Sequence, residues 1–331
     1  NGISWSNFPS LPIAVDLNSG TGNSSSTNIM SIGGDTTATN FSTQKLEYGP
    51  FNVGVWSGEA PLITGRSSGA GAGVTDAALA FGGNDPVITT TEEWNGESWS
   101  VGGALINGTR YAGGTGLQDA ALRAAGYNGS SYVSCTEEYD GSSWSAGPAT
   151  INAKATMGLT GIQNAAVMFG GEPSQNTTEE YDGSSWSAGN TMITAVVGNS
   201  GVGTQNASLS IGGYTPTVVA TVEQYDGTTW SSSVPLNIAR KYATAFGTSN
   251  SAINAGGSNN ASCSSTEEWN GVAWSSRANI AIARGNLKSS QNSLSSEGII
   301  FGGSPGGRTN SRWSISNPVN QGLYCFTKTL S

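Results

Sequence analysis

Basic residues recur at similar spacing along the chain, and they are the side chains best suited to binding chemistry. They begin successive short segments, with Val196 at the corresponding place between Lys154 and Arg240: Arg66, Arg110, Lys154, Arg240 and Arg284. Clustered guanidinium groups hold carboxylates and other anions through charge-assisted hydrogen bonds. A ring of these side chains around one opening would bind an anion or a carboxylate-bearing glycan.

A second interpretation of the same residues is structural. Each segment also carries a glutamate two residues before an aromatic residue, and Arg–Glu pairs between strands or blades would use up the positive charge. These glutamates are Glu92, Glu137, Glu179, Glu223 and Glu267.

Three tyrosines, Tyr127, Tyr132 and Tyr214, lie in or beside segments that differ from one copy to the next. An aromatic ring with a polar tip suits a binding surface, where it would stack on a sugar. The alternative is that the rings pack into the body of the fold.

Catalytic chemistry has few candidates. The chain contains no histidine, which excludes Ser-His-Asp and Cys-His catalysis and the usual histidine-bearing zinc and copper sites. A carboxylate pair can hydrolyse a glycoside, but most acidic residues occupy a repeated position, and the off-pattern ones have ordinary loop interpretations: Asp16, Asp35, Asp85 and Glu297. We therefore expect no catalytic residues and no enzyme, with a glycan hydrolase as the remaining alternative.

Metal binding is not expected either. Calcium is the one cofactor that the oxygen-rich loops could bind, but no D-x-D-x-D-G loop is present. The three cysteines permit at most one internal disulfide: Cys135, Cys263 and Cys325.

Composition narrows the possible partners. The 331 residues carry 22 acidic and 13 basic side chains, for a net charge of −9. This charge argues against a nucleic-acid partner. No run of 18 apolar residues is present, so we expect no membrane insertion.

A repeat organises the chain. TEEYDGSSWSAG occurs identically at 136–147 and 178–189, and looser copies lie at 91–102, 222–233 and 266–277. Each unit has four short segments with strand-like alternation. An Asp-Gly or Asn-Gly pair separates the last two, for which we expect a two-residue type I′ turn; the pairs are Asn95-Gly96, Asp140-Gly141, Asp182-Gly183, Asp226-Gly227 and Asn270-Gly271.

A glycine pair marks each unit and gives the number of units. Six pairs and one Ala-Gly variant predict seven units, and four-stranded units of this period are typical of a β-propeller. The markers are Gly33-Gly34, Gly82-Gly83, Ala125-Gly126, Gly170-Gly171, Gly212-Gly213, Gly256-Gly257 and Gly302-Gly303.

These motifs resemble the kelch repeat: a glycine pair, then an acidic residue, Tyr-Asp, and a tryptophan about five residues later. The resemblance covers nearly the whole chain, and the first unit (Leu46-Glu47-Tyr48, Trp56) and the last (Trp313) depart most from it. It implies a single all-β, seven-bladed kelch-like propeller with four antiparallel strands per blade. In kelch propellers that bind acidic peptides, the bases at the ring position contact the ligand.

The chain ends suggest how the circle closes. NGISWS at 1–6 matches NGESWS at 95–100, so we expect an N-terminal strand within residues 1–8 to complete the last blade, as kelch propellers commonly do. The propeller would then span 1–316. Residues 317–331 would form an extension, either an extra strand or a linker.

Antiparallel strands place the variable loops between the second and third strands on one face, opposite the uniform Asp-Gly turns. A constant scaffold with variable loops is the usual layout of a binding module. The repeat style is also similar to that of virion proteins of aquatic bacteriophages, which implies a tail-fibre or capsid-decorating protein.

The leading hypothesis is a non-enzymatic module, extracellular or on a virion surface, that adheres to a host-surface glycan or protein. One alternative is a purely structural virion component that contacts other virion proteins or copies of itself. The other is a secreted lectin-like kelch protein.

Overall fold

The computed structural model describes residues 19–22, 28–32, 42–47, 53–84, 86–173, 176–305, 307–316 and 324–329. Every regular element in these ranges is a β-strand, so the all-β class is confirmed. No helix in the described ranges is long and apolar enough to cross a membrane. The chain divides into two compact units, Gly54–Ser314 and a second made of Asn1–Val53 with Ile315–Ser331.

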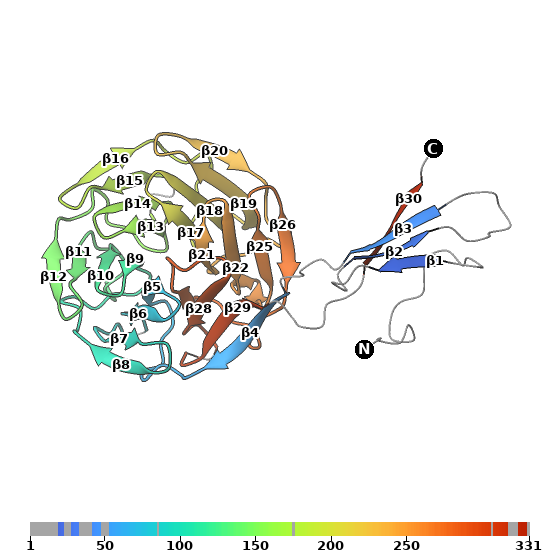
Figure 1. Cartoon of the computed structure of the whole chain (residues 1–331). Coiled ribbons are helices and arrows are strands. Elements are labelled where there is room, and N and C mark those ends of the chain that lie inside the picture. Colours follow the sequence, from blue (N-terminus) through green and yellow to red (C-terminus); the bar gives the residue numbers. More distant parts are fainter. Residues whose placement is uncertain are drawn as a thin grey trace. The chain divides into compact units, whose positions relative to one another are not determined.

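Six four-stranded antiparallel sheets form a β-propeller, with the first strand of each innermost (Figure 1). Blades 1 to 3 contain β5 (Ala70–Val74), β6 (Ala77–Phe81), β7 (Thr91–Trp94) and β8 (Trp99–Gly102); β9 (Gly113–Leu117), β10 (Ala120–Ala124), β11 (Thr136–Tyr139) and β12 (Trp144–Gly147); and β13 (Gly158–Ile162), β14 (Ala165–Phe169), β15 (Thr178–Tyr181) and β16 (Trp186–Gly189).

Blades 4 to 6 have the same order, and the loop of blade 5 adds a small hairpin. They contain β17 (Ser200–Thr204), β18 (Ala207–Tyr214), β19 (Val218–Tyr225) and β20 (Trp230–Ser233); β21 (Thr244–Thr248), β22 (Ser251–Ala255), β25 (Thr266–Trp269) and β26 (Trp274–Arg277), with β23 (Ser258–Asn259) and β24 (Ala261–Ser262); and β27 (Lys288–Ser289), β28 (Glu297–Phe301), β29 (Asn310–Ser316) and β4 (Val53–Glu59).

The expectation of seven blades is wrong, because the described propeller has six. The residues assigned to a first blade are divided between two sheets. Strand β3 (Ser42–Glu47) pairs with β2 (Asn28–Ile32) and β30 (Tyr324–Thr329) in the second unit, whereas Trp56 lies in β4 of blade 6. The spacing in the sequence agrees with this division, because Tyr48 precedes Trp56 by eight residues, whereas Tyr139 precedes Trp144 by five.

An N-terminal strand does close the last blade, but that strand is β4. Residues 1–8, which were expected in this position, lie outside the described residues. The Trp56 ring lies 5.2 Å from that of Trp313, in the place that Trp144 takes beside Tyr139 in blade 2 at 5.0 Å. The Trp56 Nε1 also donates to Thr266 Oγ1 at 3.0 Å, which joins blade 6 to blade 5.

The second unit contains one described sheet, in the order β1-β2-β3-β30, with β1 at Ser19–Gly22. The extra strand considered for the C-terminal extension is present as β30.

The repeated TEE-aromatic motif connects neighbouring blades, which explains why it is copied. In blade 1, Thr91 Oγ1 accepts a hydrogen bond from Trp144 Nε1 of blade 2 at 2.9 Å. Glu92 is buried and accepts bonds from its own blade, and Glu93 accepts one from the Tyr139 hydroxyl of blade 2 at 2.5 Å. The Tyr181 hydroxyl repeats this contact with Glu138, and the Tyr225 hydroxyl repeats it with Glu180.

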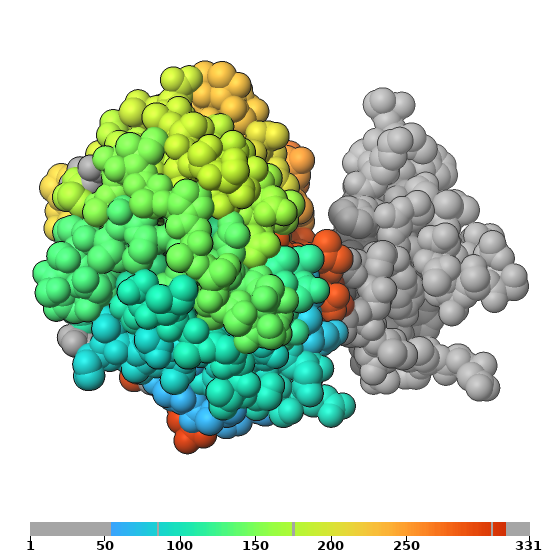
Figure 2. Space-filling model, turned by 90° about the vertical axis from the view of Figure 1, so that its left-hand side faces the viewer, coloured from blue at the N-terminus to red at the C-terminus, as the bar shows by residue number. Residues whose placement is uncertain are grey.

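The apolar core lies between blades. Leu79 and Phe81 of blade 1 form one buried cluster with Tyr139 and Trp144 of blade 2, and the Phe81 and Trp144 rings are 4.8 Å apart. Burying one such side chain contributes about 1.5–3 kcal/mol. Outward from this core lie the fourth strands, and Figure 2 shows the flank of the propeller that blades 2 and 3 present to solvent.

The Asp-Gly hairpins are present, but their turns are not of the two-residue type I′. In blade 2, Tyr139 pairs with Trp144, which leaves four residues in the turn. Gly141 has a φ of 90°, whereas Asp140 is not among the residues with positive φ. Instead, the Asp140 carboxylate accepts the N–H groups of Ser142 and Ser143 at 2.9 and 2.8 Å. These hydrogen bonds, chiefly the one from Ser143, lower the Asp140 pKa to about 2.

Candidate functional site

A closed circle of backbone hydrogen bonds surrounds one mouth of the central channel. Each blade contributes one residue whose N–H donates to the carbonyl of its counterpart in the preceding blade, at 2.7–3.0 Å. All six have φ between 55° and 66°, the left-handed region. The ring residues are Ser68, Tyr111, Thr156, Gly198, Tyr242 and Asn286.

The variable loops lie on the same face as this ring. In the loop after β6, Gly83 packs against Ser67 and Gly69 of the segment that leads into β5. On the opposite face, Gly141 of an Asp-Gly turn packs against Asp119, between β9 and β10. The expected separation of variable loops from uniform turns is therefore confirmed.

Three of the predicted basic residues point into their own blades. Arg66, Lys154 and Arg240 are at most 2% exposed. Arg66 Nη2 lies 2.5 Å from Glu92, Lys154 Nζ lies 3.4 Å from Glu179, and Arg240 is bonded to Glu267. Burial is the largest influence on their pKa values and lowers all three, while the paired glutamates act to raise them. The structure therefore shows the Arg–Glu pairing of the second interpretation at Arg66 and Arg240, and a Lys–Glu pair takes its place at Lys154.

Arg110 is displaced by one residue from the repeat position, which Thr109 occupies in blade 2. The spacing shows this, because Thr109 precedes Ala125 by the 16 residues that separate Arg66 from Gly82. The cation for Glu137 comes instead from Arg123 in β10, whose Nη1 lies 3.7 Å from the carboxylate. The structure thus does not bring the five predicted bases together, and Arg284 lacks a glutamate altogether among the described residues.

The Arg110 guanidinium lies among tyrosines instead. It is 5.2 Å from the centre of the Tyr127 ring and 5.6 Å from that of Tyr111. Tyr127 also meets Tyr132 edge to face at 5.7 Å. Desolvated cation–aromatic contacts of this kind contribute about 0.5–2 kcal/mol each.

A similar arrangement occurs at Lys241, which takes the place of Arg110 in blade 5. The Lys241 ammonium is 4.4 Å from the Tyr214 ring and 5.1 Å from the Tyr242 ring. Tyr242 lies over Gly198, where even a Cβ atom would meet its ring at 2.6 Å. A glycine in the ring of blade 4 therefore lets Tyr242 cover part of the channel mouth.

The two arrangements form one surface, which we call the tyrosine cluster: Arg110, Tyr111, Tyr127, Tyr132, Glu172, Tyr214, Lys241 and Tyr242. The Tyr132 hydroxyl donates to Glu172 at 2.8 Å, and this bond is the main cause of its raised pKa. Burial is the main cause of the raised Tyr242 pKa, followed by nearby Glu172, Tyr111 and Tyr214. Tyr132 and Tyr214 remain 37% and 38% exposed, so the cluster presents rings to solvent.

The sequence predicts Tyr127, Tyr132 and Tyr214 as binding residues, but it did not indicate the residues that contact them in the structure. Lys241 and Tyr242 directly follow Arg240, and Tyr111 follows Arg110. A comparison of the positions one and two residues after the Arg66 slot in each blade would have found this group.

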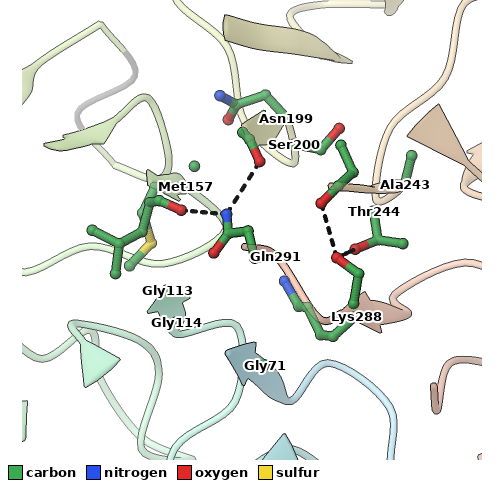
Figure 3. A pocket seen from close by; sticks show the side chains of 15 residues that line it. Gly71, Gly113, Gly114, Met157, Asn199, Ser200, Ala243, Thr244, Lys288 and Gln291 are labelled. Carbon is green, nitrogen blue, oxygen red and sulfur yellow. Dashed lines mark hydrogen bonds between the residues drawn. The ribbon is translucent and has the colours of Figure 1, made fainter. Parts of the chain in front are cut away.

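The channel behind the ring is nearly filled. A cavity of about 40 Å³ is lined by backbone of the innermost strands and by Asn199, Ser200, Lys288 and Gln291 (Figure 3). Such a volume holds about three water molecules and is far below the roughly 300–1,000 Å³ of a typical ligand pocket. Burial lowers the Lys288 pKa to about 8.

A segment of blade 6 crosses the channel and blocks it. Gln291 Nε2 donates to the carbonyls of Leu159 in blade 3 and Gly201 in blade 4, at 2.5 and 3.1 Å (Figure 3). Asn292 donates to Gly161 of blade 3 and Gly73 of blade 1. A larger ligand would therefore bind at the surface rather than within the channel. Among the described residues, no group of three or more His, Cys, Asp or Glu side chains is arranged to hold a metal ion.

A search of solved structures finds a similar fold in a protein described as YjhT. The TM-score is 0.66 at 14% identity, over 81% of this chain and 99% of that one. At this identity the likeness shows the fold alone. No protein-family model and no curated protein matches the sequence.

Proposed function

We propose that the propeller is a non-enzymatic, extracellular or virion-surface module that binds a host-surface glycan or protein through its variable-loop face. The observation that carries the proposal is the tyrosine cluster. Two half-buried cations order a set of rings, and two of those rings stay more than a third exposed. Rigid aromatic anchors with polar tips are the side chains that dominate binding surfaces.

The nearly filled channel also supports a surface site. The walls offer no volume for a sugar ring, whereas the cluster offers several rings beside hydroxyl, carboxylate and ammonium groups. Such a combination suits a glycan, which has apolar faces and many hydroxyls. The virion assignment rests on the repeat style, as does the assignment of the repeats to the kelch type.

The test is binding of the labelled full chain to a glycan array and to candidate host cells. We compare the unmodified protein with a Tyr132→Ala, Tyr214→Ala double variant, which removes the two most exposed rings of the cluster. Val272→Ala is the matched control, because Val272 is 74% exposed at a turn on the opposite face. Circular dichroism and the melting temperature confirm that each variant is folded.

We expect saturable binding by the unmodified protein and by Val272→Ala, and a loss of at least about ten-fold in the double variant, since hot-spot aromatic residues contribute about 2 kcal/mol or more. Binding that survives in the folded double variant would exclude the tyrosine cluster as the site. An absence of binding to every glycan and cell would refute adhesion and favour the structural alternative, in which the propeller contacts only virion proteins or its own copies.

A further inference from the structure

Five blades hold a glutamate carboxylate in the same niche. In each, the carboxylate accepts hydrogen bonds from two consecutive backbone N–H groups of the loop that leads into the innermost strand, at 2.7–3.2 Å. The pairs of N–H groups and their acceptors are Ile63 and Thr64 with Glu92; Ile106 and Asn107 with Glu137; Ile151 and Asn152 with Glu179; Ile193 and Thr194 with Glu223; and Asn237 and Ile238 with Glu267.

The N–H pair is the constant part of the niche, and the cation beside it varies. Arg66, Lys154 and Arg240 supply it from one repeat position, and Arg123 supplies it from another strand in blade 2. In blade 4 the repeat position is Val196, and the described structure contains no ion pair to the carboxylate there. Two aligned N–H groups are thus sufficient to hold a carboxylate at this place in the fold.

Blade 6 has the niche but not the carboxylate. Ser311 replaces the glutamate, as alignment of 310–313 with 266–269 shows. Backbone hydrogen bonds fix both ends of this loop, as they do in blade 5. At the first end, the Ile280 N–H donates to the Ser264 carbonyl, which corresponds to the bond from Leu236 to Ala220 in blade 5. At the second end, the Arg284 carbonyl accepts from the Gly257 N–H, which corresponds to the bond from Gly213 to Arg240. The N–H groups of Ala281 and Ile282 consequently occupy the donor positions, and neither has an acceptor within the described part of the chain.

The Arg284 guanidinium is also left without its usual partners. Arg284 is 1% exposed, and its Nε and Nη1 atoms have no hydrogen-bond partner in the described structure. Its Nη2 reaches only Ser311 Oγ, at 3.4 Å. In blade 5, by contrast, Arg240 Nη1 donates to the Ser265 carbonyl at 2.7 Å and Nη2 meets Glu267. Burial of a cation without a counter-ion is costly, and burial lowers the Arg284 pKa to about 10.

We infer that the blade 6 niche, formed by the N–H groups of Ala281 and Ile282, the Arg284 guanidinium and the Ser311 hydroxyl, binds a small carboxylate anion. Beyond its Cβ, a glutamate carries a methylene and a carboxylate, which together have the size of acetate. The Ser311 hydroxyl takes part of that space, so formate and acetate are the anions that fit. Ala281 and Ile282 are exposed, so the loop that carries the two N–H groups lies at the surface of the propeller.

The experiment titrates the full chain with sodium formate or sodium acetate at an ionic strength held constant with sodium chloride. Melting temperature and isothermal calorimetry are the two measurements. We expect a melting temperature that rises and saturates, because a ligand that binds only the folded state stabilises it, and calorimetry should give one site. Arg284→Val, which reproduces blade 4, should weaken the affinity by about ten- to hundred-fold, the value of a hydrogen bond to a charged group.

Ser311→Glu supplies the carboxylate from the chain itself. This variant should melt at a higher temperature without added anion and should no longer respond to formate or acetate. Val272→Glu adds the same charge at an exposed turn and should respond as the unmodified protein does.

Equal stabilisation by chloride and by either carboxylate would overturn the assignment, and so would a folded Ser311→Glu variant that still binds acetate with unchanged affinity. If Ser311→Glu does not fold, the Arg284→Val titration decides, and an unchanged affinity there refutes the niche.

Discussion

Removal of the Glu267 carboxylate should destabilise the propeller strongly. Both members of the Arg240–Glu267 pair are at most 1% exposed, so Glu267→Ala leaves a buried guanidinium without a counter-ion. It also removes the acceptor of the Asn237 and Ile238 N–H groups. Breaking a buried ion pair by deleting one partner costs about 3–5 kcal/mol. For a domain of this size each kcal/mol lowers the melting temperature by roughly 2–4 °C, which gives a decrease of roughly 6–20 °C.

Two variants provide the comparison, one at the next residue of the same motif and one at the same repeat position in blade 4. Glu268→Ala removes the neighbouring carboxylate, whose partner Arg277 is 36% exposed, and should cost about 0–1 kcal/mol. Glu223→Ala removes a carboxylate that has the N–H pair but Val196 in place of the cation, and its cost should lie between those of the other two. Differential scanning calorimetry orders the three. A Glu267→Ala variant that melts within about 2 °C of Glu268→Ala would refute the reasoning that the buried pairs support the blades.

Three further predictions concern the closing strand, the channel and the inter-blade tyrosines. Trp56→Ala should lower the free energy of unfolding, measured by chemical denaturation, by about 3–5 kcal/mol, because it removes the ring beside Trp313 and the bond to Thr266. A loss below about 1 kcal/mol would contradict closure by β4. Lys288→Met should raise the melting temperature below pH 8 and have no effect above pH 10.5. The folded pKa of about 8 lies below the ordinary value of 10.5, so the stability lost to the desolvated charge is recovered as pH rises through this window. A gain that is independent of pH would be inconsistent with this cause. Burial and the bond to Glu93 raise the Tyr139 pKa to about 12, and the Tyr181 and Tyr225 pKa values are raised further. Because these tyrosines ionise at lower pH in the unfolded chain, the free energy of unfolding should fall as pH rises from 10 to 12. Absorbance at 295 nm should show these groups ionising only above the ordinary range, and a titration complete by pH 11 would contradict the assignment.

The fold class could be predicted from the sequence because each residue of the motif has one physical role that recurs. Thr91 accepts a bond from the next blade, Glu92 holds a loop and Glu93 accepts the next tyrosine, so the spacing cannot vary without loss of these bonds. The number of blades could not be read in the same way. Whether β3 joins a blade or pairs with β30 depends on a partner near the other end of the chain, and local pattern carries no information about such pairing.

The candidate site was partly predictable for a related reason. Tyr132 and Tyr214 can be recognised in the sequence because they are aromatic residues in or beside the variable loops. The basic residues were recognised by type, but only the 16-residue spacing to the glycine pair distinguishes Arg66, which is buried in an ion pair, from Arg110, which lies among tyrosines. The direction of a side chain depends on a register of one residue, and two adjacent bases in Arg240-Lys241 point to different environments.

Closure by β4 has a mechanical consequence. Both covalent connections between the propeller and the second unit leave from blade 6, one at the start of β4 and one at the end of β29. A tensile load applied through the second unit is therefore transmitted first to the hydrogen bonds that close the circle, and blades 2 to 4 carry it only after that closure has failed. We therefore expect the blade that carries both connections to be the one in which the circle opens first under load.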